Sequence, residues 1–448
     1  MEEILIKAAQ LILSLSILVI LHELGHFIPA KLFKTRVEKF YLFFNPWFSL
    51  FKVKRGETEY GVGWLPLGGY VKISGMIDES MDKNQMKTEP QPWEYRAKPT
   101  WQRLIIILGG VIVNFLLAFL IYAMSLFYFG EKYLPNEAIT DGIWVVDSVG
   151  TNLGLQTGDK IVSLDGVAPQ KFSEINEGLL LGEEVVVNRN DEEIRIDIPE
   201  NIIGQAIEKE SPLLVMPRIP FVISAVPDSS HNATIGLEKM DQVVRINGES
   251  ITYFDEAKTV LEKYAGQEVT LDLVQEDRGT RQISAQISED GKIGVVPAMF
   301  SYKDMERMGV YDFETIKYGF FASFPAGVNK GIEKLASYWR QLSKIVDISS
   351  GAYRGLGSFG TMGKLFSSSW NWQVFWEMTA LLSIILGLMN VLPIPALDGG
   401  HAMFIIIEMV SGRPPSQKVM EAAQTVGMVL LLLLMTYAIG NDIFRAFS

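Results

Sequence analysis

The 448-residue chain contains no cysteine. Disulfide bonds, cysteine-ligated zinc and iron–sulfur clusters are therefore excluded, and any bound metal must be held by histidine, aspartate or glutamate. Histidine is also scarce, because the whole chain has only His22, His26, His231 and His401. Histidine ligation of a metal is thus confined to these four positions.

Basic residues are fewer than acidic ones, 40 against 52, and the formal net charge is −12. Residues 131–300 alone hold 30 acidic and 14 basic side chains, a net charge of −16. Such an acidic region argues against nucleic acid as a partner. Lysine and arginine gather instead in residues 31–103.

The sequence is 48% hydrophobic, and four long apolar runs account for this high fraction. They span about Ala8–Ala30, Leu104–Phe129, Val374–Leu397 and Ala422–Ile439. The length of each run is close to the ~20 residues that a helix needs to cross a hydrocarbon core of ~30 Å. No convincing signal peptide precedes the first run, so we interpret it as a retained helix. The expected fold is a multi-pass α-helical membrane protein with four transmembrane helices.

The orientation in the membrane follows from the basic residues. The excess of lysine and arginine in the 31–103 loop predicts that this loop is cytoplasmic. With four spans, both termini and the 130–373 region then lie outside the cytoplasm. The lipid bilayer is the first predicted partner.

The first apolar run contains the sequence HELGH. In a helix, His22 and His26 share one face and can bind one metal ion, and Glu23 lies beside it. This is the HExxH pattern, which supplies two zinc ligands and a general base. The alternative is a helix end with solvated histidines. Polar groups in hydrocarbon cost several kcal/mol each, which favours the metal site.

A third ligand is needed, because catalytic zinc usually takes three protein ligands. His231 lies in the predicted outer region, which leaves His401 or a carboxylate within the membrane. The third run ends in LMNVLPIPALDGGH, where two prolines break the span. Broken backbone is tolerated where it lines a polar site, so Asp398 is a candidate ligand. Asn390 is a candidate hydrogen-bond donor to the substrate or its oxyanion.

The acidic region contains a repeat. Residues 154–166 read GLQTGDKIVSLDG, and residues 236–248 read GLEKMDQVVRING. Each copy predicts a turn, a strand and a second turn. The copies resemble PDZ domains, over about 140–200 and 219–297. PDZ domains bind extended peptides and peptide termini by strand addition. Met240 departs from the pattern, which usually has glycine at that place.

A glycine-rich stretch, ETEYGVGWLPLGGYVKISG, covers residues 57–75. Two runs of strand-forming residues flank a segment that includes Gly68 and Gly69, which predicts a β-hairpin. Next to a membrane site this hairpin would be a re-entrant element on the cytoplasmic side. The alternative is an ordinary soluble hairpin.

Residues 311–347 alternate apolar and basic side chains at helical spacing. The pattern predicts an amphipathic helix at the membrane surface, broken near Pro325. The alternative is a helix that packs on the two repeat copies.

These motifs together resemble the site-2 protease family of intramembrane zinc metalloproteases. HELGH at 22–26 fits its HExxH motif, NVLPIPALDGG at 390–400 fits NxxPxPxLDG, and WLPLGGYVKISG at 64–75 fits its re-entrant loop. KPTWQRLIIILGGVIVN at 98–114 fits the start of its second helix. The resemblance covers nearly the whole chain.

The resemblance implies a role for each matching residue. His22, His26 and Asp398 would bind Zn²⁺, Glu23 would be the catalytic base, and Asn390 would support the substrate or transition state. The Gly68–Gly69 segment would present an edge strand to the substrate. The implied substrates are single-pass membrane proteins, such as anti-sigma factors or remnant signal peptides, in the bacterial inner membrane.

The predicted organisation has five parts. Transmembrane helices 1 and 2 occupy 1–130, two PDZ-like domains occupy 131–215 and 216–300, a surface-helix connector occupies 301–370, and helices 3 and 4 occupy 371–448. A zinc-binding scaffold that captures protein termini without cutting them is the alternative function. A metal transporter is the third hypothesis, which the lack of acidic residues and histidines in the second and fourth runs disfavours.

Overall fold

The computed structural model describes residues 2–66, 68–76, 89–211, 213–275, 279–300 and 302–447. The chain forms two compact units. The helical unit comprises Met1–Gly130, Lys317–Ser343 and Leu356–Ser448, and the repeat unit comprises Glu131–Ile316 and Lys344–Gly355. Each unit is described by itself.

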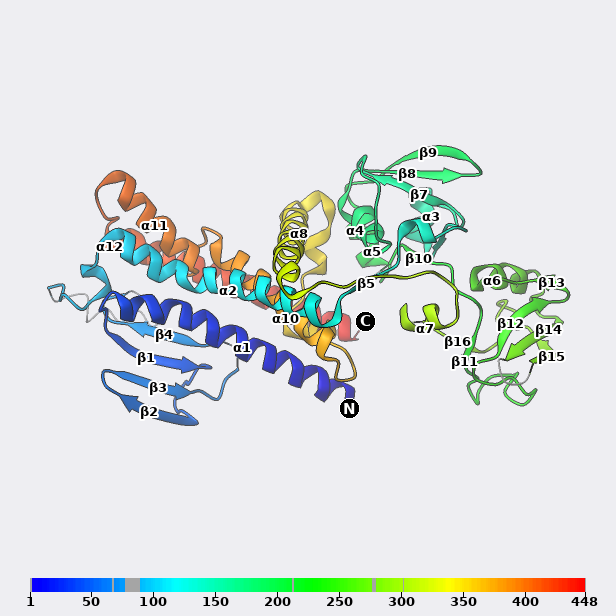
Figure 1. Cartoon of the computed structure of the whole chain (residues 1–448), viewed down its shortest axis with the longest axis horizontal. Coiled ribbons are helices and arrows are strands. Elements are labelled where there is room, and N and C mark those ends of the chain that lie inside the picture. Colours follow the sequence, from blue (N-terminus) through cyan, green and yellow to red (C-terminus); the bar gives the residue numbers. More distant parts are fainter. Residues whose placement is uncertain are drawn as a thin grey trace. The chain divides into compact units, whose positions relative to one another are not determined.

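Four helices in the described part of the helical unit are long and apolar enough to cross a membrane, as the four apolar runs predict. They are α1 (Glu2–Leu32), α2 (Thr100–Phe129), α10 (Trp372–Val391) and α12 (Gln417–Phe447) (Figure 1). The other helices of this unit are η2 (Tyr95–Ala97), α8 (Phe320–Val346), α9 (Phe359–Lys364) and α11 (Asp398–Ser411). Helix α2 is central, because it packs against α1, α10 and α11.

The third apolar run is broken as predicted, but the chain then forms a further helix. Residues 392–397 separate α10 from α11, and Asp398 is the first residue of α11. The apolar residues after the break therefore continue as α11 and do not form a loop. A Cβ at Gly399 would lie 2.3 Å from the Leu392 carbonyl oxygen, so glycine permits this sharp turn.

Glycine also sets the approach of α1 to α2. A Cβ at Gly25, within HELGH, would lie 2.4 Å from the carbonyl oxygen of Gly109. A Cβ at Gly109 would lie 1.9 Å from the carbonyl oxygen of Gly25. Small residues allow two membrane helices to meet at the backbone. The two histidines of α1 are thereby held directly against α2.

A four-stranded sheet follows α1 in the chain and lies along it (Figure 1). Its strands are β1 (Val37–Leu42), β2 (Phe51–Arg55), β3 (Thr58–Val62) and β4 (Tyr70–Ile73), in the order β2-β3-β1-β4. The hairpin predicted over 57–75 is wrong in its pairing, because β1 lies between β3 and β4. Leu67 of that segment lies outside the described residues. Strand β4 is left as an edge of the sheet.

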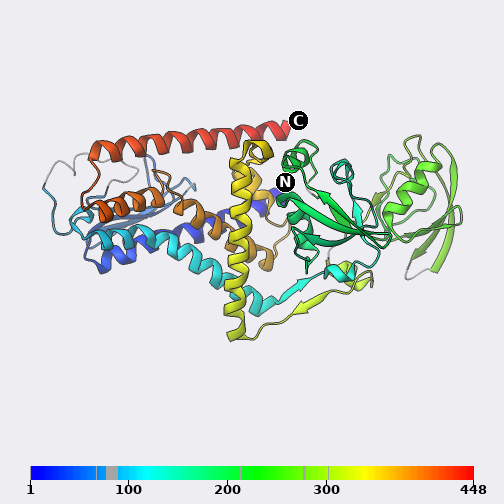
Figure 2. The same ribbon diagram turned by 90° about the horizontal axis from the view of Figure 1, so that it is seen from above.

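Helix α8 differs from its prediction at two points. It begins at Phe320 rather than near residue 311, and it continues past Pro325 without a break. It crosses α2 steeply (Figure 2), and a Cβ at Gly327 would lie 2.4 Å from the Ala123 backbone nitrogen. The small residues on one face of α8 therefore pack on α2. Its large apolar residues, such as Phe321, are exposed.

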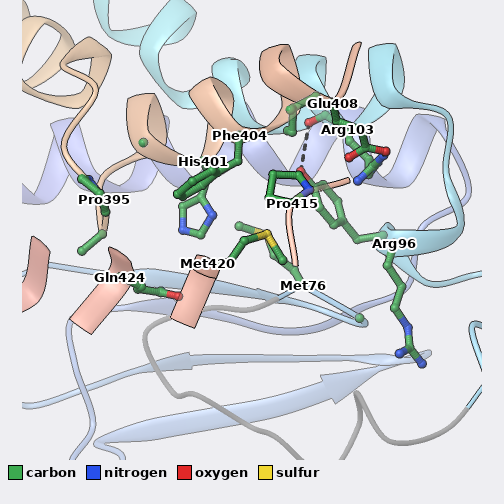
Figure 3. Close-up of a pocket in the computed structure, with 15 residues that line it drawn as sticks. Met76, Arg96, Arg103, Pro395, His401, Phe404, Glu408, Pro415, Met420 and Gln424 are labelled. Atoms are coloured by element: carbon green, nitrogen blue, oxygen red, sulfur yellow. Dashed lines mark hydrogen bonds and ion pairs between the residues drawn. The ribbon is translucent and has the colours of Figure 1, made fainter. Parts of the chain in front are cut away.

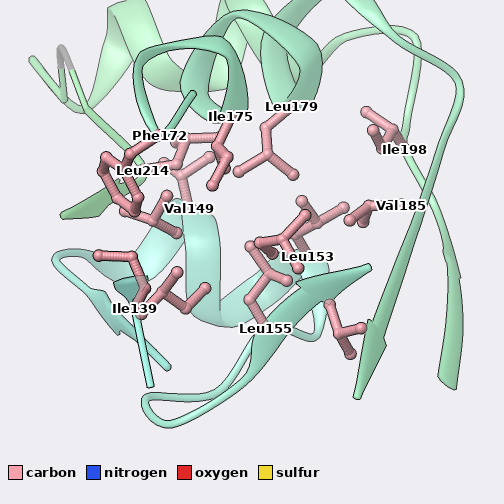
Figure 4. Packing of buried hydrophobic residues seen from close by; sticks show 14 of the residues in the cluster. Ile139, Val149, Leu153, Leu155, Phe172, Ile175, Leu179, Val185, Ile198 and Leu214 are labelled. Atoms are coloured by element: carbon pink, nitrogen blue, oxygen red, sulfur yellow. The ribbon is translucent and has the colours of Figure 1, made fainter. Parts of the chain in front are cut away.

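The repeat unit holds two separate cores, one for each copy of the repeat. The elements around the first core are β6 (Ile143–Val145), α3 (Ser148–Leu153), β7 (Lys160–Leu164), α4 (Ser173–Leu181), β8 (Glu184–Arg189), β9 (Glu192–Asp197), α5 (Ile202–Glu208) and β10 (Val215–Pro217). Figure 4 shows this core, where Ile175, Leu179 and Val185 have no exposed surface. Strand β10 pairs with β6, and β7, β8 and β9 form a sheet.

The second copy repeats this plan. Its elements are β11 (Ile223–Ala225), β12 (Gln242–Ile246), β13 (Glu249–Ser250), α6 (Phe254–Lys263), β14 (Glu268–Gln275), β15 (Gly279–Gln286) and β16 (Val296–Pro297). The remaining elements of the unit are β5 (Glu131–Tyr133), η3 (Asn136–Ala138), α7 (Tyr302–Arg307), β17 (Glu314–Ile316), η4 (Ile348–Ser350) and η5 (Ala352–Gly355). The repeated sequence forms β7 in one copy and β12 in the other.

Met240 keeps the turn of the repeat in spite of its side chain. Its φ is 72°, in the left-handed region that Gly158 occupies in the first copy with a φ of 98°. Left-handed backbone costs a residue with a Cβ roughly 1–2 kcal/mol. The second copy therefore has the predicted turn at the expense of backbone strain.

We expect Met240→Gly to stabilise the second copy by about 1 kcal/mol, because it removes this strain and the methionine side chain is 42% exposed. Hydrogen exchange of the β12 amides in the full chain should slow roughly fivefold. The reciprocal Gly158→Met should speed exchange in β7. Unchanged or faster exchange of the β12 amides in Met240→Gly would contradict the backbone strain assigned to Met240.

Candidate metal centre

Three side chains that are far apart in the sequence converge in the helical unit. His22 Nε2 lies 3.2 Å from His26 Nε2, and Asp398 Oδ2 lies 3.3 Å and 3.4 Å from these two nitrogens. Among the described residues they form the group of histidine and acidic side chains that is able to hold a metal ion. The two histidines are buried. The ligand set proposed from sequence is thus brought to one point.

The helices orient the two imidazoles. His22 and His26 lie one turn apart on α1, and His26 Nδ1 donates a hydrogen bond to the Ile106 carbonyl oxygen at 2.8 Å. That bond places the proton on Nδ1, so the lone pair of Nε2 points to the convergence point. Gly110 of α2 leaves room for the rings, because a Cβ there would lie 2.4 Å from His26 Nε2.

Glu23 faces the sheet at the start of β4. Its carboxylate accepts a hydrogen bond from the Val71 backbone. A Cβ at Gly69 would lie 2.6 Å from Val19 Cγ1 and 3.6 Å from Glu23 Cγ. Gly68 has a φ of 145° beside the Phe44 ring. The glycine segment therefore lets the chain pass close to Glu23 before β4 begins.

Asn390 and His401 lie outside the group of three ligand atoms. Asn390 is in the last turn of α10, just before the break that leads to Asp398, and is 9% exposed. His401 lines a cavity of about 100 Å³ with Phe404, Met420 and Gln424 (Figure 3). The ion pair of Arg103 with Glu408 lies in its wall. The structure thus brings Asp398, and not His401, to the two histidines.

Sequence reasoning missed the contribution of α2. Besides Gly110 and the Ile106 carbonyl, Asn114 reaches the site, with its side-chain nitrogen 3.0 Å from His22 Nδ1. The available signal was one amide and a pair of glycines inside an otherwise apolar run. A buried polar residue in a membrane helix needs a partner there. The second span therefore completes the surroundings of the histidines.

The residues fit a zinc ion by their chemistry. Two imidazole nitrogens and one carboxylate oxygen form a donor set of a catalytic zinc site, which keeps a further position for water or substrate. Asp398 Oδ2 is buried and forms no hydrogen bond of good geometry, although both histidine nitrogens lie within 3.4 Å of it. A cation would satisfy this oxygen. Asp398 in the first turn of α11 also lies at the positive end of the helix dipole.

Comparison with known proteins agrees with this reading. The model of peptidase family M50 matches residues 10–434. The chain is 27% identical to the protease RseP of Yersinia pestis, over 99% of this chain and 100% of that protein. It is 28% identical to a putative zinc metalloprotease of Vibrio cholerae, with the same coverage. It is 26% identical to the regulator of sigma-E protease RseP of Escherichia coli, over 98% of both chains.

Proposed function

This chain belongs to peptidase family M50 and is an intramembrane zinc metalloprotease, and we propose that it cuts the transmembrane segments of single-pass membrane proteins. The observation that carries the proposal is the convergence of Asp398, on α11, with His22 and His26, on a helix long enough to span a membrane. Glu23, next to the first ligand, supplies the base.

The proposed reaction is hydrolysis of a peptide bond. Zinc held by the three ligands would polarise the substrate carbonyl and acidify a water. Glu23 accepts a proton from the attacking water and returns it to the leaving amine as the carbon–nitrogen bond breaks. Asn390 donates a hydrogen bond from its amide to the substrate or to the oxyanion. The products are a carboxylate and an amine.

A transmembrane substrate must unwind before it is cut, because a helix uses its carbonyls in i to i−4 hydrogen bonds. We propose that the unwound segment pairs with the edge of β4. The support is position, since β4 is an edge strand and Val71 at its start contacts Glu23. The Gly68–Gly69 segment would hold this edge beside the scissile bond.

The repeat copies at 131–215 and 216–300 are proposed to be PDZ-like domains outside the cytoplasm, together with both chain termini. Their two matching turns and strands support this. They would exclude membrane proteins with bulky outer domains, or bind the terminus of a trimmed substrate. Substrates of the anti-sigma factor or remnant signal peptide type in the bacterial inner membrane would fit such a filter.

The proposal predicts that Glu23→Gln keeps zinc but loses roughly 10²–10⁴ in cleavage rate, because glutamine cannot accept the proton. The measurement is cleavage of a tagged single-pass membrane protein by the purified chain in liposomes, with zinc content determined in parallel.

Glu377→Gln is the matched control, since Glu377 is an acidic residue of α10 that pairs with Lys330 at 3.6 Å. It should cleave at nearly the unaltered rate. Undiminished cleavage by Glu23→Gln would refute the catalytic assignment. Full function in the cell with Glu23→Gln, combined with its loss on deletion of the repeat copies, would favour the scaffold alternative.

A further inference from the structure

Asn114 is the polar residue of α2 that reaches the metal centre, and it has no exposed surface. Its Nδ2 lies 3.0 Å from His22 Nδ1, while its Oδ1 is buried without a hydrogen-bond partner. Its backbone carbonyl is held separately, because Ser383 Oγ donates a hydrogen bond to it at 2.7 Å. The backbone is therefore anchored to α10 while the side-chain amide faces the histidine.

The two histidines have different second partners. A histidine that binds a metal through Nε2 must carry its proton on Nδ1. For His26 this is settled, because the Ile106 carbonyl oxygen only accepts hydrogen bonds. For His22 the partner is an amide, which donates from one atom and accepts with the other. The tautomer of His22 therefore depends on which way the Asn114 amide is turned.

Each orientation of the amide fixes a different position of the His22 ring proton. With Nδ2 as donor, His22 Nδ1 accepts, and the ring proton is on Nε2. That proton blocks the nitrogen that must bind zinc. Rotation of the amide by half a turn brings Oδ1 to Nδ1 instead. His22 then donates from Nδ1, its Nε2 lone pair is free, and Oδ1 gains a partner.

We propose that Asn114 is a positioning residue that selects the metal-binding tautomer of His22 by presenting its Oδ1 to His22 Nδ1. The proposal rests on the zinc site of the proposed function. It predicts that an acceptor at residue 114 is required for zinc affinity, and that a donor is not.

Two nearly isosteric substitutions separate the effect of a hydrogen-bond acceptor at residue 114 from the effect of side-chain size. Asn114→Asp keeps an acceptor and removes the donor, so zinc affinity should stay within a few-fold of the unaltered chain. Asn114→Leu removes both, and zinc affinity should fall roughly 10–100-fold, as it does when an outer-shell partner is lost. Zinc dissociation constants of the full purified chain are measured by competition with a chromophoric chelator, without substrate.

Ser383→Ala is the control, because it removes the bond to the Asn114 backbone and leaves the amide in place. It should leave zinc affinity nearly unchanged. Equal loss in Asn114→Asp and Asn114→Leu, or no loss in Asn114→Leu, would overturn the proposal. If Asn114→Leu does not fold, as judged by gel filtration, Asn114→Ala is used in its place. An unaltered chain that binds no zinc would instead refute the proposed function.

Discussion

Asp398→Asn is expected to release zinc from the purified chain and to abolish proteolysis. Asparagine has the same shape but lacks the anionic oxygen that lies 3.3 Å and 3.4 Å from the two histidine nitrogens. Two neutral imidazoles would remain, one ligand fewer than a catalytic zinc site uses. The loss of affinity should exceed the ~10–100-fold cost of removing an outer-shell partner. Metal analysis and the chelator competition measure it directly.

A second aspartate of the helical unit provides the control. Asp442 of α12 accepts hydrogen bonds from Ser358 and Thr361 at the start of α9, away from the histidines. Asp442→Asn is the same chemical change in a membrane helix, and it should leave zinc content intact. Retention of zinc by Asp398→Asn, or loss of zinc on substitution of His401, would show that the third ligand lies elsewhere.

Gly110→Ala is expected to have an effect of similar size through packing alone. The added Cβ would lie 2.4 Å from His26 Nε2 and 2.6 Å from His22 Cε1. The rings and the helices must move apart, because close-packed interiors absorb an extra carbon poorly. The metal ligands then no longer converge. Zinc content and cleavage of the tagged substrate should both fall to near background.

Gly440→Ala tests whether alanine is tolerated in a membrane helix of this chain. A Cβ at Gly440 in α12 has nothing within 4 Å, so zinc content and cleavage should be unchanged. Full zinc content in Gly110→Ala would mean that α2 does not hold the imidazoles in place. Gel filtration of both variants separates a local effect on the metal site from unfolding of the chain.

Much of the metal site was predictable because it is local. The spacing of HELGH and the 3.6-residue period of a helix place His22 and His26 on one face without further information. The four spans were predictable from apolar length. The turns of the two repeat copies were predictable because Asp-Gly and Asn-Gly favour the backbone that they need. Each of these depends on residues close in the sequence.

The pairing of the sheet was not predictable in the same way. The 57–75 segment has the composition of a hairpin, yet β1 is inserted between its two strands. Strand order is decided by which edges are free when the chain packs on α1, not by composition. Helix α8 likewise continues past Pro325, because its packing on α2 outweighs the preference of proline to break a helix.

The sequence by itself determined two candidate ligands, the candidate base and the class of chemistry, since these follow from residue type and helical spacing. The tertiary structure decided that Asp398 rather than His401 meets the histidines, and that Asn114 and Gly110 of α2 orient and accommodate them. The physical reason is that these contacts join residues on different helices. Their distances depend on how closely the backbones approach, and here glycine pairs such as Gly25 and Gly109 set that approach.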